Sequence, residues 1–226
     1  ETTVKLSVNR GSISIHTLDI TDRKAVEALP EQVISAHGSV DGLINNAGII
    51  QPFVKVSELT WPQIDKVMNV NLYGLLYMTK AFLPYLLRRP EAHIINVSSM
   101  GGFLPVPGQT IYGASKAAIK LFTEGLRSEL LDTNVHVTVV FPGAIGTNIA
   151  QNSGAMTSEQ QAAQDTGKIK MTSPVKAAQT ILDGMENDQY RVLIGSDSKM
   201  MDFFYRLNPK GAATLIYNQM KTLLAN

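Results

Sequence analysis

Short apolar runs rich in β-branched residues alternate with longer segments of helical periodicity along the chain. The apolar runs cover residues 13–18, 43–44, 94–97, 135–141 and 192–194, and the helical segments cover residues 24–37, 61–89, 111–131, 174–185 and 210–224. Strands that are apolar on both sides are typical of parallel sheets whose two faces are both buried. The alternation therefore predicts an α/β fold with a doubly wound parallel sheet, in which helices cover both faces in three layers. Ligands of such folds bind outside the carboxyl ends of the strands.

The composition is that of one globular domain. Of the 226 residues, 44% are hydrophobic and 17% are charged, 20 basic residues nearly balance 19 acidic ones, and Cys is absent. These values exclude a disordered chain, a disulfide scaffold and thiolate chemistry, and they give no general attraction to nucleic acid. The longest apolar stretch, residues 72–87, is interrupted by Lys80 and Pro84 and is too short for a transmembrane span. We expect a single domain over residues 1–226, without a metal site, in the cytoplasm.

Three residues mark the starts of predicted helices. Asp22 precedes the segment 24–37, Thr60 is followed closely by Pro62, and Ser173 is followed by Pro174. Side chains of these types accept hydrogen bonds from the first free N–H groups of a helix, and Pro is tolerated in the first turn. We predict that the helices begin at these positions.

Residues 148–173 form a polar connection rich in Ala, Gln, Ser and Gly. Connections of this length in a compact domain are uncommon unless they are functional or disordered. We interpret this one as a lid over a substrate site. A disordered surface insertion, or a short helix over residues 158–164 that closes nothing, is the alternative.

Residues 200–226 form a C-terminal extension with an apolar stripe. The stripe comprises Leu207, Leu215, Ile216, Met220, Leu223 and Leu224. We expect it to pack on the core or on a second subunit, and contact with a membrane surface is the alternative.

Tyr112 and Lys116 are four positions apart at the start of a predicted helix, within the sequence Tyr-Gly-Ala-Ser-Lys. Residues four apart lie on one face of a helix, so the ammonium can lie beneath the phenol. A neighbouring cation favours phenolate and brings the pKa of a Tyr closer to neutrality, as proton transfer requires. By itself the spacing favours a structural role, because any amphipathic helix can contain it.

Ser99 strengthens the catalytic interpretation, because it follows the apolar run 94–97 and precedes Gly101 and Gly102. Its hydroxyl can donate to a carbonyl oxygen whose negative charge grows during reduction. The two glycines allow a close-packed turn at this strand end. Without Tyr112 and Lys116, an ordinary Ser that satisfies backbone groups would be the better interpretation.

Three further motifs follow strands or interrupt helices. Asn45-Asn46-Ala47-Gly48 permits close approach of a flat ligand, and its amides can bond between neighbouring strands. Asn71 lies inside a predicted long helix, where Asn is a poor helix former, and we expect a local kink there that directs a carbonyl inward toward a water. The turn Pro142-Gly143-Ala144-Ile145-Gly146-Thr147 can present backbone groups and a hydroxyl to an amide-bearing ligand.

Together these residues resemble the short-chain dehydrogenase/reductase family over nearly the whole chain, from residues 18–22 to residues 192–195. The shared features are the Asn-Asn-Ala-Gly turn, Asn71, Ser99 thirteen residues before Tyr112, the Tyr-x-x-x-Lys spacing and the Pro-Gly turn. The resemblance implies a Rossmann-like fold and an NAD(P)-dependent oxidoreductase, with NAD or NADP as cofactor. Such an enzyme interconverts a ketone or aldehyde and an alcohol.

The resemblance also implies a role for each matching residue. Tyr112 would be the general acid/base, Ser99 would polarise the substrate oxygen, and Lys116 would lower the pKa of the Tyr and contact the nicotinamide ribose. Asn71 would hold a water that links Lys116 to solvent. The remaining cofactor contacts would be Asp19 and Ile20 to the adenine, Asn46, Ala47 and Gly48 to the adenosine side, and Pro142, Gly143, Ile145 and Thr147 to the carboxamide.

One departure from the family pattern is large. The glycine-rich turn that binds the pyrophosphate at a helix N-terminus is missing, and the sequence contains no Gly-x-Gly pair. Residues 1–7 look like the end of the family's second helix. We expect about 30 to 45 upstream residues, roughly a βαβ unit, to precede the given sequence.

Two other functions remain open. A non-catalytic protein of the same fold could bind the dinucleotide as a regulatory or scaffold signal, although the complete Asn-Ser-Tyr-Lys set favours catalysis. Sugar-nucleotide epimerases and dehydratases also use Tyr-x-x-x-Lys, but little chain remains after Gly195 for their larger C-terminal substrate domain.

The substrate and the oligomeric state are predicted only coarsely. An apolar wall near the carbonyl site favours a lipophilic or acyl-type small molecule. The residues of this wall are Met100, Phe103, Leu104, Val106 and Pro107. The resemblance suggests a homodimer or homotetramer in which residues 61–89 and 111–131 pair across a twofold axis.

Overall fold

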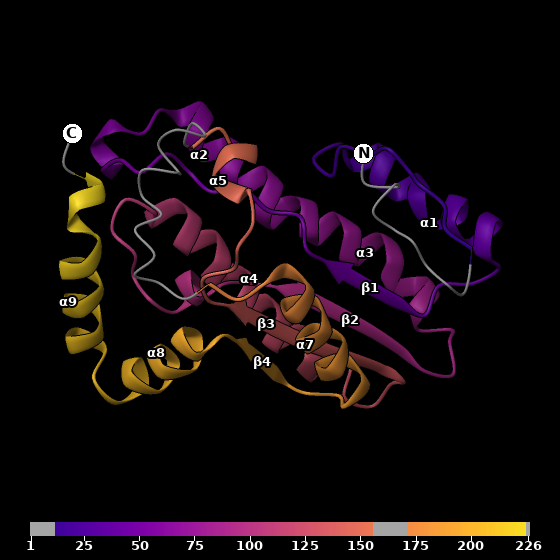
Figure 1. The fold of residues 1–226 in the computed structure, drawn as a ribbon. Helices are drawn as coiled ribbons and strands as arrows, with labels where there is room; N and C mark the ends of the chain where they lie inside the picture. Colours follow the sequence, from indigo (N-terminus) through magenta and orange to yellow (C-terminus); the bar gives the residue numbers. More distant parts are fainter. Residues whose placement is uncertain (1–11, 156–170, 225–226) are drawn as a thin grey trace.

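A computed structural model describes residues 12–155 and 171–224. Its centre is a sheet of four parallel strands in the order β1-β2-β3-β4 (Figure 1). The strands are β1 (Gly42–Asn45), β2 (Ala92–Val97), β3 (Val135–Pro142) and β4 (Arg191–Ile194). In the register Asn45 pairs with Asn96, Val97 with Val140, and Pro142 with Ile194, so the carboxyl ends of the strands meet at one edge.

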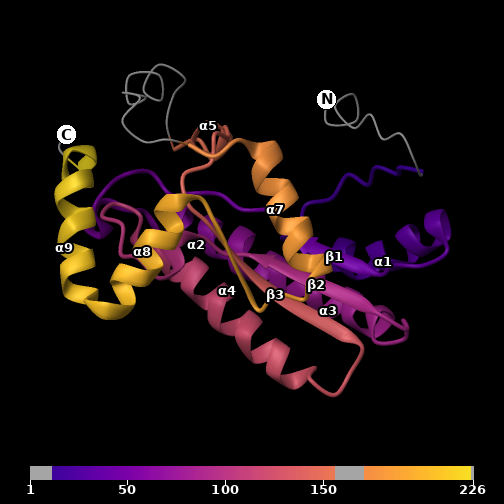
Figure 2. The same ribbon diagram turned by 60° about the horizontal axis from the view of Figure 1, so that its bottom comes forward.

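Helices cover both faces of the sheet, as the sequence predicted. The longer ones are α1 (Arg23–His37), α2 (Trp61–Met68), α3 (Gly74–Leu86), α4 (Thr110–Glu129), α7 (Pro174–Glu186), α8 (Ser196–Leu207) and α9 (Pro209–Met220). The shorter ones are η2 (Val56–Glu58), the π-helical turn η3 (Asn69–Tyr73), η4 (Met100–Gly102), α5 (Ile149–Asn152) and η5 (Lys221–Leu224). Figure 2 shows α7 on one side of the sheet and α3 and α4 on the other.

The core is divided between the two faces of the sheet because β2 is buried along its whole length. Ile94 belongs to the cluster beneath α3 and α4, and its neighbour Ile95 belongs to the cluster beneath α7. This alternation follows from the two-residue period of a strand. Each fully buried Ile of this kind stabilises the fold by about 1.5–3 kcal/mol relative to an exposed one.

The predicted helix starts are confirmed. The Asp22 carboxylate accepts hydrogen bonds from the backbone N–H groups of Lys24 and Ala25 at the start of α1. Thr60 and Gln63 form a reciprocal capping box at the start of α2, and the Ser173 hydroxyl accepts from the N–H of Lys176 in α7. Each cap removes an unsatisfied backbone donor, worth about 0.5–2 kcal/mol.

The strand predicted over residues 13–18 is wrong. This segment has no regular secondary structure, and Ile13 and Ile15 are exposed. Among the described residues no strand lies beside it, and an extended segment without a partner leaves its backbone groups to solvent. A β-branched pattern alone therefore does not produce a strand.

The helix predicted over residues 61–89 is interrupted at Asn71. The π-helical turn η3 separates α2 from α3, which confirms the expected irregularity at this residue. Turns of this kind inside helices are rare and often occur at functional sites.

The C-terminal extension contains one helix more than the sequence predicted. The helix α8 precedes α9, and the two pack together and on the chain after β2 through Leu104, Met201, Ala212 and Ile216. Of the predicted stripe, Ile216 is buried, whereas Leu207 and Leu215 are exposed. Core packing is thus confirmed for part of the stripe only.

Among the described residues, no helix has the length and apolar character needed to cross a membrane.

Candidate active site

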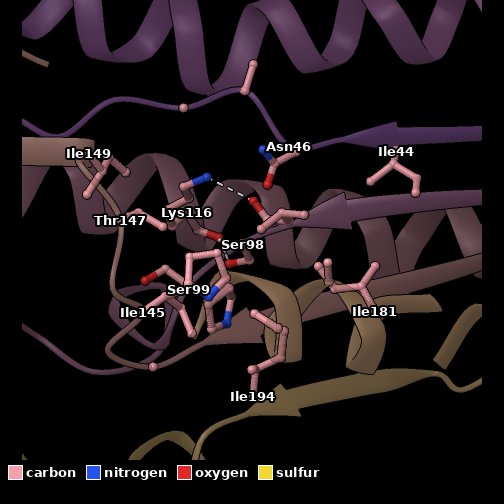
Figure 3. A pocket seen from close by; sticks show the side chains of 18 of the residues that line it. Ile44, Asn46, Ser98, Ser99, Lys116, Ile145, Thr147, Ile149, Ile181 and Ile194 are labelled. Atoms are coloured by element: carbon pink, nitrogen blue, oxygen red, sulfur yellow. Dashed lines mark hydrogen bonds between the residues drawn. The ribbon is translucent and has the colours of Figure 1, made fainter. Parts of the chain in front are cut away.

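A cavity of about 700 Å³ opens at the carboxyl ends of the strands. Its walls come from the segments that follow β1, β2 and β3, from α4, and from α5 and α7 (Figure 3). Asn46, Ser99, Tyr112, Lys116 and Thr147 all line it, although they are spread over about a hundred positions of the sequence. The fold therefore brings the predicted catalytic residues to one place.

Tyr112 and Lys116 lie in the first turns of α4. The Lys116 ammonium is buried, donates a hydrogen bond of 2.8 Å to the carbonyl of Val97, and lies 5.9 Å from the centre of the Tyr112 ring. Residues four apart in a helix are neighbours, so this proximity follows from the sequence spacing. The hydrogen bond to the Val97 carbonyl, at the end of β2, fixes the direction of the Lys116 side chain.

Burial shifts the pKa values of both groups. Burial raises the pKa of Tyr112, and a hydrogen bond with Ser99 lowers it in part. Burial lowers the pKa of Lys116 to about 8, because the charged ammonium is desolvated. The expected lowering of the Tyr112 pKa by Lys116 is therefore not the effect that this structure shows.

The loop after β2 packs tightly against α4. The Ser99 hydroxyl accepts a hydrogen bond of 3.1 Å from the N–H of Gly101 and so starts the short helix η4. A Cβ on Gly101 would lie 3.3 Å from the Tyr112 ring, and a Cβ on Gly102 would lie 2.9 Å from the carbonyl oxygen of Lys116. The close-packed turn predicted from these two glycines is confirmed.

Asn71 connects the loop after β1 with α4. It is fully buried; its side-chain oxygen accepts from the N–H of Ile49, and its side-chain nitrogen donates to the carbonyl of Ile49 and to the Ser115 hydroxyl. All three bonds are between 2.8 and 3.0 Å long. Asn71 thus holds two walls of the cavity together, and its part in a water relay stays a prediction.

The Asn-Asn-Ala-Gly turn contributes both a bond across the sheet and a place for close approach. The Asn45 side chain donates to the Asn96 side chain on the neighbouring strand at 2.8 Å, as predicted. A Cβ on Gly48 would lie 3.2 Å from the Lys116 ammonium nitrogen, so a larger residue would press on Lys116. Asn46 and Ala47 are exposed and line the cavity.

The Pro-Gly turn after β3 forms the opposite wall. Its chain pairs with Thr172 through an isolated bridge at Ile145, and the N–H of Ala144 donates to the Asp197 carboxylate at 2.6 Å. That carboxylate fills the place of a Gly143 side chain, because a Cβ there would overlap it. Asp197 was missed from the sequence; an acidic residue shortly after a strand end was the only signal.

Asp19 and Ile20 do not line the cavity. The Asp19 carboxylate accepts from the N–H and the hydroxyl of Thr21, and these bonds lower its pKa. Ile20 packs against the first residue of α3, where a Cβ on Gly74 would lie 2.7 Å from its side chain. Their contact with an adenine stays a prediction.

The residues predicted to form an apolar wall near the carbonyl site do not line the cavity, so this part of the prediction is wrong. Leu104 is buried beneath α8 and α9, and Met100, Phe103 and Val106 pack against the same cluster. Phe103, Leu104, Val106 and Pro107 line a separate hollow of about 650 Å³ instead. A run of apolar residues after an active-site Ser does not reveal which side of the loop they occupy.

Gln51 was also missed. It is buried and binds the start of α4, but in the sequence a Gln before a Pro looks like a solvated loop residue. Nothing in the local pattern could have identified it.

The hydrogen-bonding groups that line the cavity, all from the described part of the chain, fit a nicotinamide dinucleotide. Backbone and hydroxyl groups of the turn 142–147 suit a carboxamide, and the buried Lys116 ammonium suits ribose hydroxyls. Asn46, Ala47 and Gly48 form a small, open rim on the other side. The residues present therefore fit the group that the resemblance implies.

Comparisons with known proteins agree with the fold and the site. A family model described as short chain dehydrogenase matches residues 1–158. The chain is 36% identical over 211 residues to a protein of Mycobacterium tuberculosis that carries the oxidoreductase designation SadH, covering 91% of this chain and 76% of that one. It is 37% identical over 143 residues to the 3-oxoacyl-(acyl-carrier-protein) reductase FabG of Thermotoga maritima, covering 62% of this chain and 57% of FabG.

Solved structures show the same similarity. A short-chain dehydrogenase/reductase from Burkholderia phymatum in complex with NAD superposes with a TM-score of 0.71 at 26% identity, covering 80% of this chain and 70% of that one. A short-chain dehydrogenase from Burkholderia cenocepacia in complex with NADP gives a TM-score of 0.72 at 27% identity, covering 88% and 76%.

A Rossmann-like parallel sheet with Ser, Tyr and Lys at its carboxyl edge defines an NAD(P)-dependent oxidoreductase. The chain belongs to the short-chain dehydrogenase/reductase family. The fold class, the family and the oxidoreductase activity expected from the sequence are thereby confirmed, and the preference between NAD and NADP is left open.

Proposed function

We propose that this chain reduces a lipophilic ketone or aldehyde, or oxidises the corresponding alcohol, with Tyr112 as the group that transfers the proton. The observation that carries the proposal is the convergence of Ser99, Tyr112 and Lys116 on one cavity from two different segments. When bound, NAD or NADP supplies or accepts the hydride at its nicotinamide. The residues of the chain orient the substrate and move the proton.

The Tyr112 hydroxyl donates a proton to the substrate oxygen during reduction and accepts one during oxidation. Burial keeps this phenol protonated at neutral pH, because it raises the pKa of Tyr112. The phenol therefore carries the proton that reduction needs, and a cation beside it favours release of that proton. Ser99 hydrogen-bonds with the same phenol and holds the substrate oxygen beside it.

Lys116 supplies positive charge beside the reacting centre. With a pKa of about 8 it is largely protonated at pH 7 and keeps an ammonium inside a buried site. A phenolate formed at Tyr112 would be stabilised by this cation, since the Nζ atom lies 5.9 Å from the ring centre. We assign Asn71 to hold the water through which Lys116 exchanges protons with solvent.

The cavity favours an uncharged, lipophilic substrate. Lys116 is the one charged side chain among the described lining residues. Ile50, Ile145 and Ile149 are among the apolar residues that line the same cavity. A charged substrate would lose its hydration there, and the one cation, Lys116, already donates to the Val97 carbonyl, whereas an apolar substrate gains from burial.

We further propose one domain in which the connection 148–173 acts as a lid, within a cytoplasmic homodimer or homotetramer. The start of that connection contains the short helix α5, and the hydroxyl of Ser153, directly after the helix, accepts from the N–H of Ile50 at 3.0 Å. Residues 156–170, including the short helix considered over 158–164, lie outside the described part. For the oligomer, Ala114, Ala117 and Leu121 form an exposed small-and-apolar face on α4.

The test is a titration of the full-length protein with NADH and NADPH, followed by turnover measurements with a panel of ketones and aldehydes. We expect saturable binding of at least one nucleotide and higher kcat/KM for apolar ketones than for keto acids of equal size. Nucleotide binding without turnover of any substrate in the panel would favour the non-catalytic alternative. Equal rates with apolar and acidic ketones would contradict the substrate class.

A further inference from the structure

Helix α4 carries the catalytic Tyr at a position where backbone donors need an external partner. The helix begins at Thr110, and the first intrahelical bond is made by the N–H of Gly113 to the carbonyl of Gln109 at 2.8 Å. The N–H groups of Ile111 and Tyr112 precede it and have no acceptor within the helix. Gln109 occupies the capping position, but its side chain makes no capping bond.

Gln51 provides the missing acceptor from sixty positions earlier in the chain. Its side-chain oxygen accepts hydrogen bonds from the N–H groups of Ile111 at 2.8 Å and Tyr112 at 3.0 Å. A local N-cap residue makes this same pair of bonds to the second and third helical residues. Gln51 is 1% exposed, so water cannot replace it without opening the structure.

The side-chain nitrogen and the backbone carbonyl of Gln51 form hydrogen bonds with the loop before α4. Its side-chain nitrogen donates to the carbonyl of Gly108 at 2.9 Å, and its backbone carbonyl accepts from the side chain of Gln109 at 2.8 Å. The amide is therefore fixed in one orientation, with the oxygen toward α4 and the nitrogen toward the loop.

The carbonyl side of Tyr112 is held from the same direction. The Ser115 hydroxyl donates to the carbonyl of Tyr112 at 2.7 Å and accepts from Asn71 at 3.0 Å. Asn71 in turn binds both backbone groups of Ile49, two residues before Gln51. The segment 49–51 thus holds the Tyr112 backbone at its N–H and, through Asn71 and Ser115, at its carbonyl.

We infer that Gln51 is a positioning residue that sets the location of the Tyr112 phenol by capping α4 with a neutral amide. The inference deepens the proposed function and rests on it for the role of Tyr112. A carboxylate would accept the same two bonds, but it would put a negative charge in the buried turn that carries the catalytic phenol. That charge would raise the pKa of Tyr112 further, whereas an amide caps the helix without this effect.

The experiment compares two substitutions in the full-length protein. Gln51→Met keeps the length of the side chain and removes both polar atoms, whereas Gln51→Glu keeps an acceptor for the two N–H groups but, when ionised, loses the donor to the Gly108 carbonyl. For Gln51→Met we expect kcat to fall at least about 10-fold, because a displacement of about 1 Å at a catalytic group has effects of this size. Binding of NADH or NADPH, measured by nucleotide fluorescence, should change less than about 3-fold.

Gln51→Glu should recover much of the lost kcat and move the pH profile of kcat for the alcohol oxidation to higher pH. This shift shows that the side chain at position 51 lies close enough to the phenol for a charge there to act on its pKa. Thr138→Val is the matched control, because Thr138 is equally buried and loses its bonds to Gln189 and His93 far from the cavity. We expect that control to lower the melting temperature and leave kcat unchanged.

Amide hydrogen exchange of residues 110–113 tests the inference without any turnover. Exchange should accelerate in Gln51→Met and stay near the native rate in Gln51→Glu and Thr138→Val. Unchanged exchange in Gln51→Met would overturn the capping role, even in a protein without measurable activity. Accelerated exchange together with native kcat would overturn the positioning role, whereas failure of the unsubstituted protein to reduce any carbonyl would contradict the proposed function alone.

Discussion

The two ends of the sheet contain ionisable groups in opposite situations. At the carboxyl ends, Lys116 is buried, and among residues 12–155 and 171–224 no carboxylate lies within salt-bridge distance of it. At the amino ends, Asp188 is bound by two side-chain nitrogens of Arg127 at 2.9 and 3.1 Å and by His136 at 3.0 Å. The charge of Lys116 at the carboxyl ends has no carboxylate partner among the described residues, whereas the charges of Asp188 and Arg127 at the amino ends compensate each other.

The pKa shifts follow this division. Burial alone would raise the pKa of Asp188, but its hydrogen bonds and its attraction to Arg127 and His136 lower it. Burial lowers the pKa of Lys116 to about 8, with no opposing charge to restore it. Lys116 therefore carries its charge without a compensating carboxylate, whereas the charge of Asp188 is compensated by its partners.

The largest expected effect is on catalysis at the carboxyl end. Tyr112→Phe removes the hydroxyl to which we assign the proton transfer and leaves the ring that packs on Gly101. We expect kcat to fall by about 10²–10⁴-fold, the range for loss of a general acid. Steady-state kinetics with the best carbonyl substrate measures this, and nucleotide titration is the control for intact binding. Turnover within a factor of three of the native value would refute the assignment.

Lys116→Met should lose activity and gain stability. The folded pKa of Lys116 is about 8 against an ordinary value of 10.5, so the unfolded chain binds more protons between these values and native stability rises with pH from about 8 to 10.5. At pH 7 the buried charge is a cost, and we expect the Met variant to be more stable by about 1–2 kcal/mol.

Urea unfolding at pH 7 and at pH 10 measures this difference. The advantage of the Lys116→Met variant should shrink at the higher pH, where the native amine is largely neutral. A variant that is less stable than the native protein at pH 7 would show that the bond to the Val97 carbonyl outweighs the desolvation of the charge.

Arg127→Met tests the amino end and should change stability without changing catalysis. The substitution leaves Asp188 without its bidentate partner and the Val137 carbonyl without a donor. We expect a loss of about 1–2 kcal/mol at pH 7, since both side chains of the pair are partly exposed. The contribution of Asp188 is present above its unfolded pKa and disappears as pH falls through its lowered folded pKa.

Chemical denaturation at pH 7 and at pH 3 measures the stability difference for Arg127→Met, and kcat at pH 7 is the control. The gap between native and variant should narrow at the lower pH. A fall in kcat comparable to that of the carboxyl-end variants would contradict the claim that the amino-end ion pair contributes to stability and not to catalysis.

His93→Phe should give the smallest effect. We expect it to change only the slope with which the melting temperature depends on pH. Thr138 gives its hydroxyl proton to the carbonyl of Gln189, so His93 donates to the Thr138 oxygen through its Nε2–H. Burial lowers the pKa of His93 to about 4 from 6.5, and the unfolded chain therefore binds more protons between these values. Native stability should fall as pH decreases from 6.5 to 4.

Melting temperatures recorded every half unit between pH 7 and pH 4 should show a shallower fall for His93→Phe than for the native protein. Parallel curves would mean that His93 is not the source of this acid sensitivity. Nucleotide binding should be equal in both proteins, because His93 lies at the amino end of β2.

Much of the site was predictable because its residues sit at positions with local signatures. Ser99 and the Pro-Gly turn follow apolar strands, and Tyr112 and Lys116 share a helix face, so parallel topology alone brings them to one edge. The apolar residues after Ser99 were misassigned, because a loop pattern does not show which side of the loop faces the cavity. They lie under α8 and α9, of which α8 was not predicted.

The sequence by itself determined the periodicities, the helix caps at Asp22, Thr60 and Ser173, and the Tyr-Lys spacing, because each depends on residues within a few positions of one another. The tertiary structure decided that residues 13–18 form no strand, that burial raises the pKa of Tyr112, and that Gln51 caps a helix sixty positions away. These outcomes depend on which distant segments pack together and on how far that packing removes groups from water. A sequence pattern of a few residues predicts neither.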